Sequence, residues 1–313
     1  MDHPNRDALK TFNEHSLPDL DVVTLGALEL LAEEDVPSFD YSLFKRPVVV
    51  GSGNAEITGR ILFEKQDAVF ADESSYETVM SSVRGIDGAV LISSSGSKHA
   101  VVLARDLHQT RKLPIRLLTN NPNAPAKEHL APEDILVFPK NREPYTYNTS
   151  TYMGMILSYT KENTVAIRNF ILSDTASRIR SDFADFDAFY LIVPSSYNTM
   201  REMFQTKFDE LFGPYVSGRV FTLEQTKHAK TVIASEKELF ISFGEEQDVF
   251  GGEGRRLHIP LPHHAGYGAM MAIGYYVIGH IQKQHPPYFK KNIVRYMEET
   301  SRVFGNTLKP IVE

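Results

Sequence analysis

The residues most suited to chemistry begin with a run of hydroxyl side chains. The run is Ser93, Ser94, Ser95, Gly96 and Ser97, and Lys98 follows it. It lies between residues 89–92, an apolar stretch typical of a buried strand, and residues 99–110, whose apolar spacing predicts a helix. Free backbone N–H groups and the helix dipole favour an anion at such a junction. The run therefore predicts an anion site, with a plain turn capped by Ser97 as the alternative.

Further polar residues follow other predicted strands. A short buried strand, residues 47–50, is followed by Gly51, Ser52 and Asn54, and Ser150 and Thr151 open a predicted helix after the fifth strand. Ligands of parallel sheets bind at the carboxyl ends of the strands, so each of these residues is a candidate contact for a ligand. Each is also a good cap or turn residue, which is the alternative.

The second half of the chain carries charged residues at suggestive spacing. Lys207 and Glu210 are one helical turn apart, Lys227 precedes His228, and Lys309 lies near the C-terminus. Taken alone, these residues are typical of an exposed ion pair, a surface histidine and a disordered chain end. His258, His263 and His264 do not have the spacing of a zinc site, and we expect no metal.

Composition excludes several classes of function. The 313 residues include no cysteine, which excludes disulfides, thiolate metal sites and a cysteine nucleophile. The formal net charge is −7 without a basic run, so we expect no nucleic-acid partner. No stretch is long and apolar enough to span a membrane, and the N-terminus lacks the pattern of a secretory signal. We expect a cytoplasmic protein that does not bind membranes.

The spacing of apolar runs predicts an α/β protein. Strands and helices alternate from residue 47 to about 161, which indicates a parallel sheet with helices on both faces. A charged helix over residues 164–185 is expected to connect this sheet to a second alternation, residues 188–284. We expect an N-terminal helical segment, residues 1–44, a first domain, residues 45–165, and a second domain, residues 180–313. The weak internal repeat suggests duplication of one unit.

These motifs together resemble the sugar isomerase (SIS) family. From about residue 45 onward the chain is similar to the isomerase half of glucosamine-6-phosphate synthase, which is a tandem of two SIS domains. The family's phosphate loop reads S-x-S-G-x-[ST], and Ser93, Ser95 and Gly96 match it, while Lys98 replaces the last hydroxyl residue. Lys207 and Glu210 match the family's K-x-x-E, Lys227-His228 its K-H dipeptide, and Asn306 to Lys309 its C-terminal N-x-x-K.

The resemblance implies two flavodoxin-like three-layer domains and a cofactor-independent reaction. It implies that an aldose phosphate and a ketose phosphate of a hexose or amino-hexose are interconverted through an enediolate. Glu210, one helical turn from Lys207, would be the base, and Lys207 would belong to the same catalytic segment. His228 would transfer the proton of the anomeric hydroxyl, and Lys309 would stabilise the enediolate from a closing tail.

Two other functions stay open at this point. SIS relatives include deglycases or deaminases of sugar phosphates, and non-catalytic sensors of phosphosugars. A sensor needs the serine loop but not Glu210, His228 and Lys309. The resemblance also implies a homodimer with its active site near the subunit interface.

Overall fold

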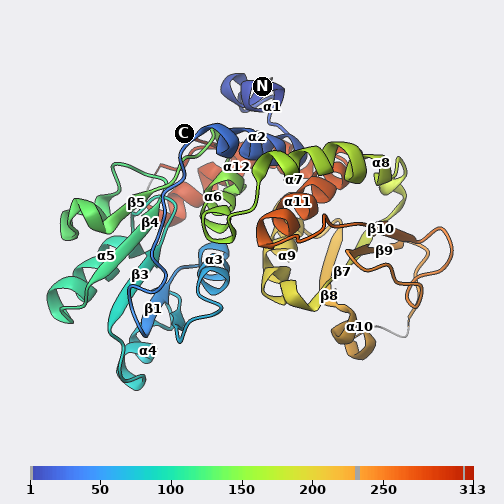
Figure 1. The fold of residues 1–313 in the computed structure, drawn as a ribbon. Coiled ribbons are helices and arrows are strands. Elements are labelled where there is room, and N and C mark those ends of the chain that lie inside the picture. Colours follow the sequence, from blue (N-terminus) through green and yellow to red (C-terminus); the bar gives the residue numbers. More distant parts are fainter. Residues whose placement is uncertain (1–2, 230–232, 306) are drawn as a thin grey trace. The chain divides into compact units, whose positions relative to one another are not determined.

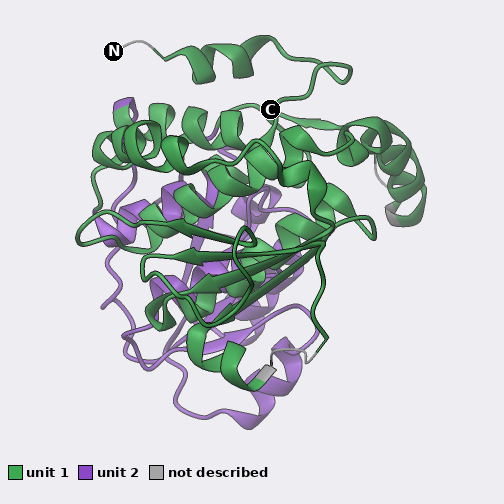
Figure 2. Cartoon of the chain, turned by 90° about the vertical axis from the view of Figure 1, so that its right-hand side faces the viewer, with its two compact units in different colours: residues 1–32, 141–150, 162–313 green, residues 33–140, 151–161 purple. Residues whose placement is uncertain are grey.

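The chain forms two compact units, each built around a parallel sheet (Figure 1). The computed structural model describes residues 3–229, 233–305 and 307–313. The first-sheet unit consists of residues 33–140 and 151–161, and the second-sheet unit of residues 1–32, 141–150 and 162–313, as Figure 2 shows in purple and green. Residues 1–32 and 141–150, assigned by the sequence to the N-terminal segment and the first domain, thus fold with the second sheet.

The first sheet has five strands in the order β2-β1-β3-β4-β5, and every neighbouring pair is parallel. The strands are β1 (Pro47–Val50), β2 (Val69–Ala71), β3 (Gly88–Ile92), β4 (Ile115–Thr119) and β5 (Ile135–Val137). β1 and β3 are buried throughout, as expected of central parallel strands. The strand order reverses between them, which is where parallel sheets of this kind bind ligands.

Helices pack on both faces of this sheet (Figure 1). They are α3 (Asn54–Leu62), α4 (Tyr76–Ser82), α5 (His99–Arg105), which continues as a π-helical turn (Asp106–Thr110), and most of α6 (Thr149–Thr160); two 3₁₀ turns (Pro125–His129 and Pro132–Asp134) precede β5. One face of the sheet forms a core with α4 and α5. These elements fall close to the predicted ranges because each strand is an uninterrupted apolar run.

The second sheet has four parallel strands in the order β10-β9-β7-β8. They are β7 (Ala188–Val193), β8 (Ser217–Thr222), β9 (Glu238–Phe243) and β10 (Arg256–Ile259). Counted along the chain, this order is the same as that of the first four strands of the first sheet. Both sheets are parallel, and helices alternate with their strands. This confirms the predicted fold class, an α/β protein with parallel sheets flanked by helices.

The helices of this unit include several that the sequence does not predict. They are α1 (Pro4–Thr11), α2 (Leu20–Glu33), α7 (Thr164–Phe170), a π-helical turn (Ile171–Thr175), α8 (Ala176–Arg178), 3₁₀ turns (Phe183–Asp185 and Ser195–Met200), α9 (Arg201–Phe212), α10 (Leu223–Ala229), α11 (Tyr267–Gln284) and α12 (Tyr288–Phe304). The predicted connecting helix ends at Arg178 instead of Asp185, and α1, α10 and α12 are additional. Among the helices of the described residues, none combines the length and hydropathy needed to cross a membrane.

The C-terminal tail is a strand of this unit. β11 (Ile311–Val312) pairs antiparallel with β6 (Glu143–Pro144), and the Tyr145 N–H donates to the Pro310 carbonyl at 2.8 Å. Arg142 Nε lies 3.0 Å from the carboxylate of Glu313. These contacts hold the chain end beside residues 142–145.

Close packing of β8 against α9 should make Gly218 intolerant of a side chain. A Cβ at this position would overlap the ring of the buried Phe208. We expect Gly218→Ala to lower the free energy of unfolding by about 1–3 kcal/mol, as overpacked cores do, measured by urea denaturation. Exposed Ser217 is the control, and Ser217→Ala should change little. Gly218→Ala should cost less stability in a Phe208→Ala background, which lacks the ring, than in the wild type. An equal cost in both backgrounds would contradict this explanation.

Candidate active site

Most of the predicted anion-binding residues line one cavity of the first-sheet unit. The cavity has a volume of about 280 Å³ and lies at the carboxyl ends of β1 and β3. The predicted residues that line it are Gly51, Ser52, Ser93, Ser94, Ser95, Ser97 and Lys98. The two loops meet at this cavity because both follow strands that are neighbours in the sheet.

The serine loop turns its carbonyl groups away and leaves hydroxyl groups at the cavity. The Ser94 carbonyl accepts hydrogen bonds from Thr119 Oγ1 (2.9 Å) and the Asn120 N–H (3.1 Å). The hydroxyls of Ser95 and Ser97 are 2.7 Å apart and form a hydrogen bond. A hydroxyl group rotates to suit its partner, so this pair can donate to an anion after rearrangement.

Two backbone positions of the loop have positive φ. Gly96 (φ 60°) packs so closely on Ala124 that a Cβ would overlap it, so its role is to let the loop adopt this conformation. It does not line the cavity. Lys98 also has a positive φ, 51°, which is uncommon for a residue with a side chain. It lies directly before α5 and lines the cavity. Backbone strain of this kind is concentrated at functional sites. Lys98 is also the one lysine or arginine among the cavity's lining residues within the described part of the chain.

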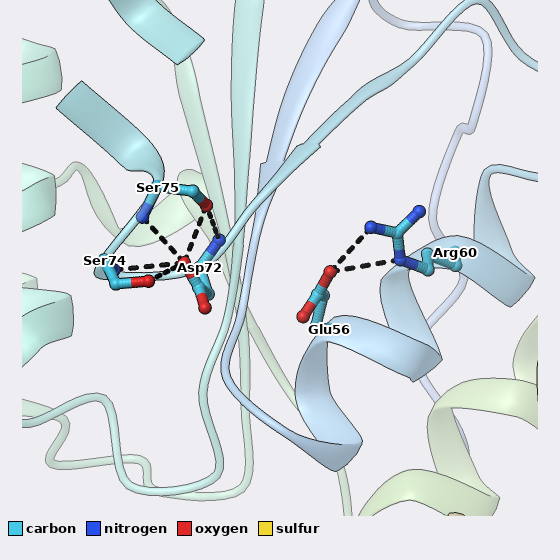
Figure 3. Close-up of polar contacts among 5 residues, drawn as sticks. All are labelled: Glu56, Arg60, Asp72, Ser74 and Ser75. Atoms are coloured by element: carbon cyan, nitrogen blue, oxygen red, sulfur yellow. Dashed lines mark hydrogen bonds and ion pairs between the residues drawn. The ribbon is translucent and has the colours of Figure 1, made fainter. Parts of the chain in front are cut away.

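Glu73 is a lining residue that sequence reasoning missed. The Ser52 hydroxyl donates a hydrogen bond to its carboxylate. The preceding residue, Asp72, accepts hydrogen bonds from the backbone and hydroxyl groups of Ser74 and Ser75, which Figure 3 shows together with the Glu56–Arg60 ion pair of α3. These bonds lower the pKa of Asp72 to about 2. The signal in the sequence is the Asp-x-Ser-Ser turn directly after β2.

Besides Gly96, three predicted residues lie outside this cavity's lining. Asn54 is buried at the start of α3, and its Oδ1 has no hydrogen-bond partner among the described residues. Ser150 and Thr151 are buried at the start of α6. The Ser150 hydroxyl donates to Glu143 and accepts from the Asn141 N–H at 3.0 Å, so it is occupied within the protein. Nothing in this geometry supports a ligand contact for Ser150 or Thr151.

Lys207 and Glu210 form a buried ion pair in the second-sheet unit. Lys207 is fully buried on α9, and its Nζ donates to Glu210 Oε2 at 2.6 Å and to the Thr146 carbonyl at 2.8 Å. The ring of Tyr275 lies 5.7 Å from the same Nζ. The pair is therefore not the exposed i,i+3 pair that the spacing alone would suggest.

The loop of residues 145–148, whose Thr146 carbonyl accepts a hydrogen bond from Lys207, has an unusual conformation. Thr146 has a φ of 76°, an outlier for a β-branched residue, and Asn148 has a φ of 46°. Between them, the Tyr147 hydroxyl donates to the Pro18 carbonyl at 3.3 Å and accepts from Gln282 at 2.9 Å. The strained Thr146 carbonyl is thus held where Lys207 can reach it.

Glu210 lines a cavity of about 460 Å³, all of whose lining residues belong to the second-sheet unit. The lining residues come from the end of α9, the following loop, Thr146 and the first half of α12. The Glu210 side chain keeps 23% of its surface exposed, yet burial raises the pKa of its carboxyl, while Lys207 opposes the shift. A carboxylate that is accessible and has a raised pKa is suited to accept a proton near neutral pH.

His228 and Lys309 do not line this cavity in the described part of the chain. His228 is exposed on α10. Lys309 is exposed. The next residue, Pro310, accepts a hydrogen bond from the Tyr145 N–H, so the tail passes beside the loop of residues 145–148. Asn306, part of the N-x-x-K match, lies outside the described residues. No group of three histidine or carboxylate side chains is close enough to hold a metal ion within residues 3–229, 233–305 and 307–313.

Sequence comparison finds no matching family model and no matching curated protein. Solved structures do match. The C-terminal domain of glucosamine-fructose-6-phosphate aminotransferase from Francisella tularensis has a TM-score of 0.60 at 13% identity, covering 88% of this chain and 98% of that one. Tagatose-6-phosphate ketose/aldose isomerase from Escherichia coli has a TM-score of 0.55 at 13% identity, covering 92% and 90%. The chain has the SIS fold.

A third SIS structure of similar likeness is glucosamine-6-phosphate deaminase from Thermotoga maritima. Its TM-score is 0.52 at 13% identity, and the match covers 88% of this chain and 93% of that one. Identities this low establish the fold alone, so the reaction has to be argued from the side chains of this chain.

Removal of the Lys207 charge should raise the pKa of Glu210 further. Lys207 is the group that opposes the effect of burial, so in Lys207→Met the carboxylate loses its stabilising partner. We expect the titration midpoint of Glu210 to move to higher pH in a ¹³C NMR titration of glutamate-labelled protein, with the signal assigned through Glu210→Gln. Lys10→Met removes an exposed i,i+3 partner, that of Asp7, and is the control. An unchanged midpoint in Lys207→Met would show that the pair does not set the pKa of Glu210.

Proposed function

We propose that this protein is a cofactor-independent sugar-phosphate isomerase that interconverts an aldose phosphate and a ketose phosphate. The observation that carries the proposal is the Glu210 carboxylate, which a fully buried lysine orients at the edge of a cavity and burial tunes to a raised pKa. This is the kind of group needed to move a proton between C1 and C2 of an open-chain sugar. The substrate would be a hexose or amino-hexose phosphate.

The first-sheet unit would supply the phosphate site. Its cavity combines four serine hydroxyls of the loop and the Lys98 side chain at the carboxyl ends of two parallel strands. The Ser52 hydroxyl, which would have to turn from Glu73 to reach a phosphate, lines the same cavity. Hydrogen bonds from such donors to a charged phosphate are stronger than neutral ones. The proposal requires that this site and Glu210 act on one substrate molecule, within a chain or between the subunits of the homodimer that we propose.

The remaining roles follow the reaction. Glu210 would remove the proton from one carbon and return it to the other through an enediolate. His228 would transfer the proton between the anomeric hydroxyl and the ring oxygen when the ring opens, and Lys309 on the tail would stabilise the enediolate oxygens. The structural neighbours that act on sugar phosphates support this chemistry. We propose that the protein acts in the cytoplasm.

Release of an amine from an amino-sugar phosphate is the second candidate function. A deaminase has the same fold, and the same base would serve such a reaction. The aromatic and acidic lining of the Glu210 cavity favours this candidate, because carboxylates and aromatic rings attract a protonated amine. A non-catalytic sensor has less support, because binding a phosphate requires neither a buried lysine nor a carboxylate of raised pKa.

Glu210→Gln should abolish turnover while phosphosugar binding is retained. The amide keeps the size of the side chain but cannot accept a proton. We expect the rate of interconversion of fructose 6-phosphate or a related ketose phosphate with its aldose to fall by about 10²-fold or more, measured by proton exchange with ²H₂O in NMR. In the wild-type protein, kcat/KM should fall as the pH decreases through the raised pKa of Glu210. Full activity of the Gln variant would rule Glu210 out as the base.

Ser95→Ala should weaken phosphosugar binding without changing the titration of Glu210. It removes one hydroxyl of the serine loop, and a lost hydrogen bond to a charged group costs roughly 10- to 100-fold in affinity. Isothermal titration calorimetry with fructose 6-phosphate measures this change. Ser81→Ala on α4, whose hydroxyl bonds to the Thr78 carbonyl, is the control and should bind normally. Unaltered affinity in Ser95→Ala would place the phosphate elsewhere.

A further inference from the structure

Glu73 is a carboxylate in a cavity that is otherwise suited to an anion. It lines the cavity of about 280 Å³ in the first-sheet unit together with the serine loop and Lys98. Two negative groups in one small cavity repel each other unless a hydrogen-bond donor lies between them. A phosphate ester therefore binds well beside Glu73 only if the same molecule brings a donor to this carboxylate.

The turn that carries Glu73 is held by its own side chains. The Asp72 carboxylate accepts hydrogen bonds from the N–H groups of Ser74 (3.0 Å) and Ser75 (2.7 Å), and the Asp72 N–H donates to the Ser75 hydroxyl at 3.0 Å (Figure 3). The backbone on both sides of Glu73 is thereby fixed. Since β2 pairs with β1, this turn lies beside the residues that follow β1.

The Ser52 hydroxyl is the partner of Glu73 in the structure. It donates its one proton to the Glu73 carboxylate, so it has no proton to offer an anion in this arrangement. Ser52 can donate to a bound phosphate only by turning away from Glu73. The carboxylate then loses a hydrogen bond next to a second negative group, which is costly unless another donor replaces Ser52.

A hexose 6-phosphate has a suitable donor in its open-chain form. The carbon next to the phosphate ester is C5. In the pyranose form of an aldohexose 6-phosphate and in the furanose form of a ketohexose 6-phosphate, O5 closes the ring and carries no proton. In the open chain, O5 is a hydroxyl group that can donate a hydrogen bond.

We propose that Glu73 accepts a hydrogen bond from the C5 hydroxyl of an open-chain hexose 6-phosphate, so that the first-sheet cavity selects the form of the substrate that reacts. The inference rests on the proposed function, because it takes the ligand to be a sugar phosphate whose ring has to open. On binding, Ser52 turns from Glu73 to the phosphate, and the C5 hydroxyl takes its place on Glu73. Ser52, Glu73 and the C5 hydroxyl are then all paired.

The direct test compares two probes that do not react, sorbitol 6-phosphate and 1,5-anhydroglucitol 6-phosphate. The first is always an open chain with a C5 hydroxyl, and the second is a closed ring whose O5 has no proton. Isothermal titration calorimetry gives the ratio of their affinities. We expect this ratio to favour sorbitol 6-phosphate about tenfold more in the wild-type protein than in Glu73→Met. Glu73→Gln keeps an acceptor oxygen, so its ratio should fall less.

Sulfate provides a test of opposite sign, because it carries no proton to donate. Glu73→Met removes the repulsion and releases the Ser52 hydroxyl, so the affinity for sulfate should rise about twofold or more. Glu77→Met on α4 is the matched control. It removes an exposed carboxylate paired with Arg111 and changes the net charge by the same amount. Neither the ratio nor the affinity for sulfate should change in this variant.

An equal loss of affinity for both probes in Glu73→Met would overturn the inference, because Glu73 would then only hold the loop after β1 in place. An unchanged ratio, or binding of neither probe to the wild-type protein, would overturn it as well. Urea denaturation shows whether each variant is folded. If Glu73→Met does not fold, Glu73→Gln decides, and an unchanged ratio in that variant overturns the inference.

These outcomes are distinct from a failure of the proposed function. If fructose 6-phosphate is isomerised in a Glu210-dependent reaction while Glu73→Met leaves the ratio unchanged, the proposed function stands and the role of Glu73 falls. If the preference for sorbitol 6-phosphate depends on Glu73 while no sugar phosphate is turned over, the cavity stands as a site for open-chain phosphates and the proposed isomerase function falls.

Discussion

The burial of the Lys207 ammonium group is the constraint on which the rest of the second-sheet unit depends. An unpaired ammonium group without access to water costs several kcal/mol, so the fold has to surround it with acceptors. Two acceptors are in place, Glu210 on the same helix and the Thr146 carbonyl. The helix provides the first by simple i,i+3 spacing. The second requires that a loop distant in sequence be fixed against α9.

Both ends of the chain help to fix that loop in the second-sheet unit. The loop is fixed by contacts from both ends of the chain: the Tyr147 hydroxyl reaches the Pro18 carbonyl before α2, and β11 pairs with β6 just before the loop. α2 is in turn held on α11, where Gln282 accepts from the Leu20 N–H at 2.9 Å and Lys283 pairs with the buried Asp21. The Pro18 carbonyl and β11 thus tie both ends of the chain to the segment that carries the Thr146 carbonyl.

The sequence predicts well what local patterns encode and poorly what distant contacts decide. Each parallel strand is a short apolar run, so strands such as residues 89–92 are found within a residue or two, and the serine loop falls where expected. Neither the paired tail nor Thr146 has such a pattern: β11 is two residues long, and a threonine at φ 76° contradicts local preference. Burial of the Lys207–Glu210 pair was equally hidden, since its spacing is the same as that of many exposed pairs. Glu73 is marked only indirectly, by the Asp-x-Ser-Ser turn in which it lies.

Two carboxylates near Lys207 could be taken for the base, and their surroundings separate them. Burial raises the pKa of Glu143 as well as that of Glu210, and Lys207 opposes the shift in both. The oxygens of Glu143 are committed to the start of α6, where the N–H groups of Thr149 and Ser150 donate to them at 2.6 and 2.8 Å. Its side chain is buried as well, so no substrate carbon can approach it.

Glu210 differs in access and in the use of its oxygens. Lys207 donates to its Oε2, the side chain remains partly exposed, and it faces the cavity. Glu143 thus acts as a structural carboxylate that holds the first turn of α6 and the neighbouring loop in place. Lys207 orients Glu210 and limits the rise of its pKa. The Glu210 carboxylate, unlike that of Glu143, is therefore both partly exposed and in contact with a cavity.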